Sequence, residues 1–229
     1  MSTAAKNTAP SEELPQRLVG PLYAALAAVI DPKPELHFSN CFELLIAVVL
    51  SAQATDRSVN AVTEGLFARC RTPEDFIAFG VERLEAATRT IGLYHAKSRA
   101  IIGLCRQLVA QHGGQVPADY DALTALPGVG PKTARVVLNV GFHQPVIAVD
   151  THIFRVANRT GLACGKTPEA VSRLLAVRTP PQYRLHAHHY LLLHGRYTCT
   201  ARAPQCAKCP IAAFCRTNAA AARRPAPEP

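Results

Sequence analysis

The sequence predicts an all-α protein. Of its 229 residues, 48% are hydrophobic, and the apolar residues gather in alanine- and leucine-rich runs with little of the β-branched alternation typical of strands. Apolar positions recur at helical spacing along most of the chain, which gives roughly ten helices and no sheet. A chain of this length can bury one large core or two small ones.

The first expected helix covers residues 12–30. It follows residues 1–11, a polar segment without periodicity that is expected to be disordered. The proline-rich residues 31–34 end the helix. Its core face carries four apolar residues at helical spacing: Leu18, Leu22, Leu26 and Val29.

Start and stop signals mark the remaining helices. Asn40 is a suitable N-cap for a helix so apolar that burial on nearly all sides is expected, and Thr55 or Asp56 can cap the next. The sequence TPED from Thr72 combines an N-cap, a proline at the first helical position and acids in the first turn. The other helices are expected at residues 42–50, 56–70, 96–111, 119–126, 133–140 and 152–158, with one more that starts near residue 167 and one that ends near residue 193.

The charge of the chain favours a polyanionic partner. There are 25 Lys and Arg residues against 16 Asp and Glu, a formal net charge of +9, and nucleic acid is the usual partner of such a protein. The longest apolar run, residues 41–50, has about half of the length of a membrane span. The N-terminus lacks the apolar core of a signal peptide. We therefore expect no membrane association and a cytoplasmic, nucleoid-associated location.

The most informative stretch is residues 126–134, LPGVGPKTA. It forms a tight, glycine-rich turn between two expected helices, where Gly128, Val129 and Gly130 can present backbone N–H groups to a phosphate. The proline after them suits the first position of the second helix, so Lys132 falls in its first turn. A nucleotide-binding P-loop is excluded, because that motif needs Gly directly before Lys and a preceding strand. An ordinary helical corner with a solvated lysine fits this stretch equally well.

Eight cysteines in a chain without a secretion signal are expected to be thiols or metal ligands rather than disulfides. Four are expected to be small buried residues in apolar surroundings: Cys41, Cys70, Cys105 and Cys164. The other four follow the spacing C-x6-C-x2-C-x5-C: Cys199, Cys206, Cys209 and Cys215. One compact loop can wrap such thiolates around Zn²⁺ or a [4Fe–4S] cluster; the spacing does not decide between them, and zinc is the commoner choice. Lys208 lies in this loop, which is expected to hold basic side chains against phosphates.

Four separate motifs converge on one family. They are the turn at residues 126–134, VDTHIFR at 149–155, SAQATD at 51–56 and the cysteine spacing. Together they resemble the endonuclease III family, bifunctional DNA glycosylases of the helix–hairpin–helix superfamily. The sequence HGRYTC at residues 194–199 looks like the family's lead-in to its cluster, and the likeness extends over residues 18–216. The chain departs from the family pattern at Pro131, where the family commonly has a basic residue.

The resemblance implies a base excision repair enzyme that removes oxidised pyrimidines from duplex DNA and cleaves 3′ to the abasic site. It places the nucleophile at Lys132, whose amine attacks C1′ of the sugar and forms a Schiff base that permits β-elimination. The positive end of a helix dipole favours the neutral amine that this step needs. Asp150 is implied to stabilise positive charge on the sugar and to assist proton transfer, and it can also cap the next helix. At the four cysteines the resemblance implies a [4Fe–4S] cluster instead of zinc.

Chemistry at C1′ requires the nucleotide to leave the base stack, and the vacated space must be filled. Gln53 and Leu93 lie in breaks between expected helices. The resemblance implies that Gln53 fills the vacated space and that Leu93 wedges the opposite strand. Without the resemblance, Leu93 is better interpreted as a core residue and Gln53 as an amide that caps its loop.

The helices are expected to form two lobes. One comprises residues 39–150, and the other combines residues 12–38 with 151–216, since the N-terminal helix needs an apolar partner. Residues 217–229 are expected to be a flexible tail. Damaged duplex DNA would bind the monomeric protein in the groove between the lobes, with the catalytic residues at its mouth. Two alternatives compete: an adenine glycosylase acting on mispairs, which usually has a further C-terminal domain and lacks the nucleophilic lysine, and a DNA-binding module that uses the turn and the cysteine loop only for attachment.

Overall fold

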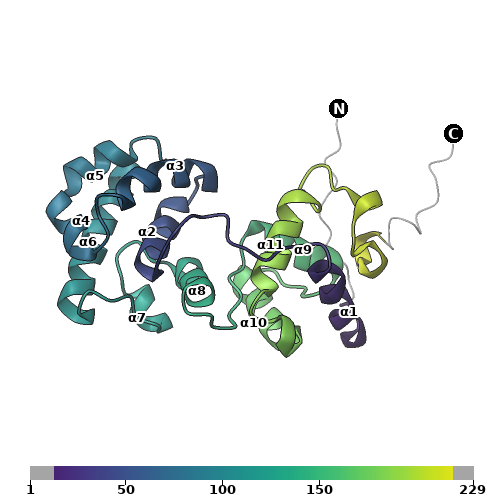
Figure 1. Cartoon of the computed structure of the whole chain (residues 1–229). Coiled ribbons are helices and arrows are strands. Elements are labelled where there is room, and N and C mark those ends of the chain that lie inside the picture. The colour runs from purple at the N-terminus through teal and green to yellow at the C-terminus, as the bar shows by residue number, and fades with distance from the viewer. Residues whose placement is uncertain (1–12, 219–229) are drawn as a thin grey trace. The chain divides into compact units, whose positions relative to one another are not determined.

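A computed structural model of the chain describes residues 13–218 (Figure 1). Eleven α-helices and three short 3₁₀ helices lie within these residues, and none of the described residues forms a strand. The predicted all-α class is confirmed. No described helix has the length and apolarity needed to cross a membrane. The segment expected to be disordered, residues 1–11, lies outside the described residues, as does the expected C-terminal tail apart from residues 217 and 218.

The described chain divides into two compact units. The hairpin unit, Pro34–Gln144, contains α2 (Cys41–Ser51), α3 (Asp56–Phe67), α4 (Pro73–Phe79), α5 (Val81–Thr88), α6 (Tyr94–His112), α7 (Tyr120–Thr124) and α8 (Pro131–Val140). The cysteine-loop unit, formed by the described residues up to Lys33 and from Pro145 onward, contains α1 (Gln16–Ala27), α9 (Thr151–Thr160), α10 (Pro168–Arg178), η1 (Pro181–Tyr183), α11 (Ala187–Tyr197), η2 (Cys206–Lys208) and η3 (Ala212–Phe214). The boundaries expected from the sequence were residues 39 and 150, so Asp150 joins the cysteine-loop unit.

Helix α2 is the centre of the hairpin unit. Every residue from Phe42 to Leu50 is buried, which confirms the burial predicted on nearly all sides. Helix α2 packs against α3, α6 and α8, and α6 packs in turn against α4 and α5. Because α2 has no face that would be stable in water, its burial fixes the positions of its neighbours.

Side-chain caps set the starts of α2, α3 and α4, as the sequence predicts. Asn40 Oδ1 accepts a hydrogen bond at 2.9 Å from the backbone N–H three residues later, and the side chain of Thr55 caps α3 in the same manner. Thr72 and Asp75 form a reciprocal capping box at the start of α4. The break at Gly80 was not predicted. Its φ of 80° suits a glycine, and it separates α4 from α5.

Three predictions about single residues are wrong. Helix α1 ends at Ala27, before the expected end at residue 30, so Val29 lies beyond the helix and is 64% exposed instead of facing the core. Cys41 and Cys164, expected to be buried, are only partly buried; Cys41 is the first residue of α2, and Cys164 follows the end of α9. Cys70 and Cys105 are buried as predicted.

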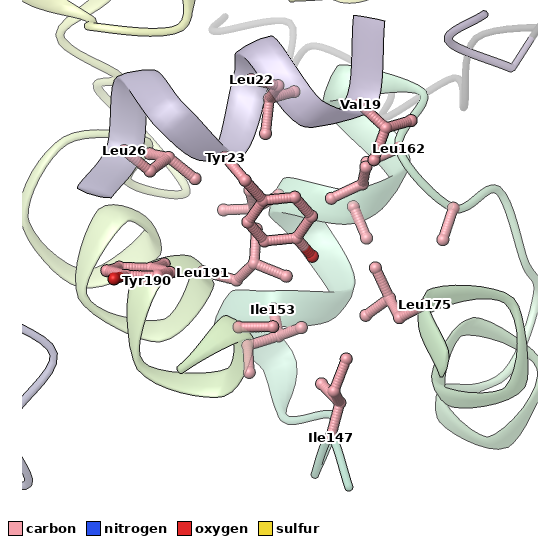
Figure 2. Close-up of a cluster of buried hydrophobic side chains, with 14 of the residues drawn as sticks. Val19, Leu22, Tyr23, Leu26, Ile147, Ile153, Leu162, Leu175, Tyr190 and Leu191 are labelled. Atoms are coloured by element: carbon pink, nitrogen blue, oxygen red, sulfur yellow. The ribbon is translucent and has the colours of Figure 1, made fainter. Parts of the chain in front are cut away.

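Helices α1, α9, α10 and α11 build the core of the cysteine-loop unit (Figure 2). Four residues of α1 are fully buried there: Val19, Leu22, Tyr23 and Leu26. The Tyr23 hydroxyl shares a hydrogen bond of 3.0 Å with the Thr179 hydroxyl, which satisfies its buried oxygen. Helix α9 packs along α11. The helix that begins after Asp150 is therefore fixed against the helix that leads to Cys199.

Candidate active site

The predicted glycine-rich turn lies between α7 and α8. Pro131 occupies the first position of α8, as predicted, and Gly130 is its N-cap residue. Gly128 and Gly130 are exposed, whereas the side chain of Val129 between them is only 5% exposed. The Val129 N–H donates to the carbonyl oxygen of Leu126 at 3.1 Å. Val129 therefore anchors the turn in the core, and its N–H is already occupied.

The two glycines serve different needs. Gly128 has a φ of +78°, and a Cβ built on it would lie 2.9 Å from Cβ of Ala100, so both conformation and packing require glycine. Gly130 has a φ of −89°, and a Cβ there would meet nothing within 4 Å. The backbone N–H groups of both glycines donate no backbone hydrogen bond within the described residues, and no side chain caps α8. The turn thus presents unbonded N–H donors at the positive end of a helix dipole.

Lys132 lies in the first turn of α8, as predicted, and its side chain is exposed. No hydrogen bond or ion pair within residues 13–218 occupies its amine. A lysine at this place adds a mobile positive group directly after the N–H donors of the turn. A phosphate bound at the turn would therefore lie close to a lysine amine that has no competing partner.

Asp150 is the N-cap residue of α9, and its Oδ1 accepts a hydrogen bond from the Ile153 N–H at 2.8 Å. This confirms the capping role expected from the sequence. The other carboxylate oxygen, Oδ2, has no hydrogen-bond partner within the described residues. The carboxylate is half-buried and close enough to Arg155 for its charge to raise the pKa of that guanidinium, against a larger lowering by burial. One oxygen is thus structural, and the other is free to interact with a substrate.

Gln53 and Leu93 share an uncommon backbone conformation. Their φ values are 56° and 62°, in the left-handed region that residues other than glycine rarely adopt. Both are exposed, and Leu93 has 63% of its surface in contact with solvent. The alternative interpretation of Leu93 as a core residue is therefore wrong. The Gln53 side chain makes no hydrogen bond within the described residues, so it does not cap its own loop.

The clustered cysteines lie around η2 and η3, beyond α11, and all are free thiols. Burial raises the pKa of the Cys209 thiol and of the Cys215 thiol. Arg159 Nη1 is 3.6 Å from Cys199 Sγ, and His194 Nε2 is 3.8 Å from Cys209 Sγ. Within residues 13–218 no three His, Cys, Asp or Glu side chains stand at metal-ligand spacing. The loop therefore supplies four thiols from one short segment of the chain.

Two arginines that the sequence analysis did not single out tie this loop to α9. Arg155 and Arg159 donate four hydrogen bonds of 2.7 to 3.0 Å to backbone carbonyl oxygens of residues 195–201. Both lie one helical turn apart on α9, in the VDTHIFR motif or just beyond it. Lys208, the basic residue expected to face phosphates, lies in η2 and is exposed. The arginines thus hold the loop, and the lysine is left on its surface.

Comparison with known proteins now decides the family. A family model described as HhH-GPD superfamily base excision DNA repair protein matches residues 46–181, more than half of the chain. The endonuclease III of Treponema pallidum is 56% identical over 192 residues, which cover 84% of this chain and 91% of that protein. The endonuclease III of Escherichia coli strain K12 is 54% identical over 184 residues, 80% of this chain and 87% of that protein. The chain belongs to the endonuclease III family.

Solved structures of endonuclease III agree with this membership. One described as a trapped endonuclease III–DNA covalent intermediate has a TM-score of 0.85 at 44% identity and covers 92% of this chain and 100% of that chain. A non-covalent endonuclease III–DNA complex has a TM-score of 0.83 at 44% identity and covers 91% of this chain and 98% of that chain. A thermostable thymine-DNA glycosylase shares the fold, with a TM-score of 0.79 at 22% identity. The endonuclease III family predicted from the four motifs is confirmed.

The sequence analysis also missed a buried lysine in α6. Lys97 of α6 is only 7% exposed, and its ammonium donates to two backbone carbonyl oxygens. The signal was present, because Lys97 stands at helical spacing before Ile101, Leu104 and Leu108, which are all fully buried. A lysine in such an apolar series indicates a buried ammonium with its own partners.

Proposed function

We propose that this member of the endonuclease III family removes oxidised pyrimidines from duplex DNA and cleaves the strand 3′ to the abasic site, with Lys132 as the nucleophile. Family membership gives the enzyme class, a base excision repair DNA glycosylase and lyase at abasic sites. One observation carries the role of Lys132. Its amine is exposed and unpaired in the first turn of α8, directly after a turn with unbonded N–H donors.

The turn would bind the DNA backbone. A phosphate can accept hydrogen bonds from the N–H groups of Gly128 and Gly130, and the dipole of α8 adds to the attraction. These contacts are independent of sequence, which suits an enzyme that must scan duplex DNA for damage. Because α8 starts at this turn, a phosphate held there brings a neighbouring sugar within reach of Lys132. Binding and chemistry would then share one helix start.

The reaction follows from an amine at C1′. The Lys132 amine attacks C1′, and the C1′–N bond breaks with its electron pair on the damaged base, which takes up a proton. Opening of the sugar ring leaves a protonated Schiff base between C1′ and Nζ. Removal of a proton from C2′ then expels the 3′ phosphate as the C3′–O bond breaks, and water hydrolyses the Schiff base to release Lys132.

Asp150 would support two of these steps. Its Oδ2 has no hydrogen-bond partner, so it can accept a proton from the attacking amine and stabilise positive charge that develops on the sugar. Its Oδ1 stays engaged with the Ile153 N–H, which keeps the carboxylate in one orientation. A carboxylate held by one oxygen and free at the other meets the requirement that a catalytic group be positioned before the reaction.

Gln53 and Leu93 would serve the extrusion of the damaged nucleotide. The base must leave the stack before C1′ can be attacked, and side chains that enter the vacated space reduce the cost. Both residues have left-handed φ values and are exposed, and within the described residues neither side chain makes a capping hydrogen bond. We assign Gln53 to the vacated space and Leu93 to the opposite strand.

We infer that the four clustered cysteines hold a [4Fe–4S] cluster. Four free thiols from one loop are the donor set that such a cluster requires, and nitrogen atoms of Arg159 and His194 lie beside two of the sulfur atoms. When bound, the cluster would fix the shape of the loop that carries Lys208, an exposed cation for a DNA phosphate. A protein with this substrate would work at the nucleoid in the cytoplasm.

Borohydride trapping tests the proposed reaction. Wild-type protein should form a covalent adduct with a duplex that contains thymine glycol, and Lys132→Ala should form none. Lys166→Ala removes another exposed lysine and should trap as well as wild type. A wild-type protein that binds the duplex but gives no adduct would be a glycosylase without the lyase step or a DNA-binding module, and the proposal would be wrong.

Elemental analysis tests the cofactor separately. Purified protein should contain iron and acid-labile sulfide and be coloured, and replacement of Cys206 by Ser should lower the iron content. A colourless protein that contains zinc and no iron would overturn the cluster assignment while leaving the trapping result untouched.

A further inference from the structure

Lys97 is a buried lysine whose charge is not balanced by an acid. Its Nζ donates to the carbonyl oxygens of Leu50 at 2.8 Å and Ala52 at 2.5 Å. None of the ion pairs within residues 13–218 includes it. Burial lowers the pKa of its ammonium. Burying an ammonium without a carboxylate partner costs free energy. We therefore ask what the two hydrogen bonds to carbonyl oxygens contribute to the structure.

The two carbonyl oxygens belong to the end of α2. Ser51 is the last residue of this helix, and Leu50 and Ala52 lie on either side of it. The last carbonyl groups of a helix lack partners within the helix and carry the negative end of its dipole. The Lys97 ammonium therefore acts as a C-terminal cap of α2, supplied by another helix. Gln53 follows directly, so the cap fixes the backbone from which Gln53 projects.

The backbone of Lys97 reaches the second turn. Its N–H donates to the carbonyl oxygen of Leu93 at 3.0 Å, because Leu93 is the N-cap residue of α6. The two turns are also neighbours: a Cβ built on Gly92 would lie 3.9 Å from the carbonyl oxygen of Gln53. One residue thus bonds to both turns, through its ammonium to one and through its backbone to the other.

The conformation of these turns explains why such a residue is needed. Gln53 and Leu93 adopt left-handed φ values of 56° and 62°, which are unfavourable for side chains with a Cβ. Backbone in this region persists only where the surroundings hold it. The side chains of Gln53 and Leu93 are exposed and provide no such hold themselves. The Ala54 N–H closes the Gln53 turn by donating to the carbonyl oxygen of Ser51 at 3.0 Å, and Lys97 adds the hydrogen bonds that come from outside this turn.

We propose that Lys97 is a positioning residue for base extrusion, which holds Gln53 and Leu93 at a fixed separation so that both can enter the duplex together. The proposal rests on the proposed function, since it assigns Lys97 to the extrusion step of that reaction. Lys97 itself touches neither DNA nor the reacting atoms. Its effect should appear in steps that need extrusion and be absent from steps that do not.

Lys97→Met tests this separation of steps, because methionine keeps an unbranched side chain but loses the donor. Single-turnover excision of thymine glycol from a duplex should fall by about a hundredfold, as for other small displacements of positioned groups. Cleavage at an abasic site in single-stranded DNA needs no extrusion and should change by about twofold or less. Fluorescence of 2-aminopurine opposite the lesion should rise with saturating wild-type protein and stay low with Lys97→Met.

Two variants exclude a general loss of stability. Leu104→Ala removes a fully buried side chain from the same helix and should lower the melting temperature without separating the two activities. Lys97→Arg keeps a cationic donor and should retain most of the duplex activity. If Lys97→Met does not fold, Lys97→Gln replaces it in the test, because glutamine keeps neutral donors. Lys97→Gln should also lose duplex excision selectively, but by a smaller factor. An equal loss of both activities in the Lys97 variant, or a selective loss in Leu104→Ala, would overturn the proposal.

A double variant and the wild type complete the test. If Lys97 acts through Gln53, then Lys97→Met with Gln53→Ala should lose no more duplex activity than the stronger single variant. Fully additive losses would show that Lys97 acts independently of Gln53, against the proposal. Wild-type protein that forms no borohydride adduct would overturn the proposed function and this proposal together. Normal trapping by wild type with unchanged excision by Lys97→Met would overturn this proposal alone.

Discussion

The guanidinium of Arg155 joins α9 to the first residue of the cysteine loop: its Nε donates to the carbonyl oxygen of Cys199 at 3.0 Å. Its Nη2 also donates to the carbonyl oxygen of Gly195 at 2.7 Å. Asp150 caps the same helix one turn earlier. The helix that Asp150, the proposed catalytic carboxylate, caps is therefore also the helix that holds the start of the cysteine loop.

Arg155→Met should loosen this connection. The two hydrogen bonds to the carbonyl groups of Gly195 and Cys199 would be lost, so we expect about 2 kcal/mol lower stability and faster loss of iron from the proposed cluster to a chelator. Iron release followed in the presence of bathophenanthroline, together with thermal unfolding, measures both. Arg173→Met removes an exposed arginine of α10 in the same unit and should release iron as slowly as wild type. Equal release rates for both variants would contradict the role of Arg155.

Asp150→Asn should separate catalysis from capping. Asparagine caps a helix as well as aspartate, so the start of α9 should be preserved. The variant lacks the negative charge and the proton acceptor, and kcat should fall by about a hundredfold or more. The Kd for an uncleaved lesion duplex should change by about threefold or less. Equal losses in turnover and binding would make Asp150 a cap and nothing more.

Alanine substitutions at Gly128 and Gly130 should give opposite outcomes. At Gly128 the added methyl group meets Ala100 at 2.9 Å and the φ is positive, so stability should fall by about 2 kcal/mol. At Gly130 the methyl group enters open space, so the melting temperature should hold while affinity for duplex DNA falls. Thermal unfolding and fluorescence anisotropy with an undamaged duplex distinguish the two. Unchanged DNA affinity in Gly130→Ala would argue against a phosphate at this turn.

The sequence predicted features that depend on residues within one helical turn. The caps at Asn40, Thr72 and Asp150 were all predictable, because each is a local hydrogen bond between a side chain and a nearby N–H. The break at Gly80 and the exposure of Val29 were not. Both depend on how the helices pack in the folded protein. The helical spacing of apolar residues continues beyond the observed helix end in each case, so it does not mark that end.

The turn before Lys132 was predictable, because its motif combines several residue types. The metal site predicted from the cysteine spacing stays a prediction. The exposure of Leu93 was not visible from the residues, since a left-handed φ turned it outward against its hydropathy. Lys97 had a signal in its apolar spacing, but its partners are the carbonyl groups of Leu50 and Ala52, more than forty positions away. No local rule indicates that contact.

Pro131→Lys should strengthen DNA binding. Pro131 is exposed at the start of α8, beside the unbonded N–H groups of the turn. We expect about fivefold higher affinity for DNA at low salt. The slope of log K against log salt concentration should steepen by about one, because one more phosphate contact releases one more counterion. Pro131→Ala removes the proline without adding charge and should leave the salt slope as in wild type. An unchanged slope in Pro131→Lys would mean that no phosphate lies near this position.

His189 should make the protein less stable as the pH falls below neutrality. Burial is the main cause that lowers its pKa to about 3, and the charges of His188, His186 and Arg196 lower it further. The unfolded chain binds a proton near the ordinary histidine pKa of about 6.5, so between this value and about 3 the unfolded state holds more protons. The stabilisation is therefore complete above about pH 6.5 and is lost at about 1.4 kcal/mol per pH unit on acidification. His189→Leu cannot take up this proton, and urea unfolding between pH 7 and pH 5 should show a slope smaller by about one proton. If the slope of the variant equals that of wild type, another group is responsible for the acid sensitivity.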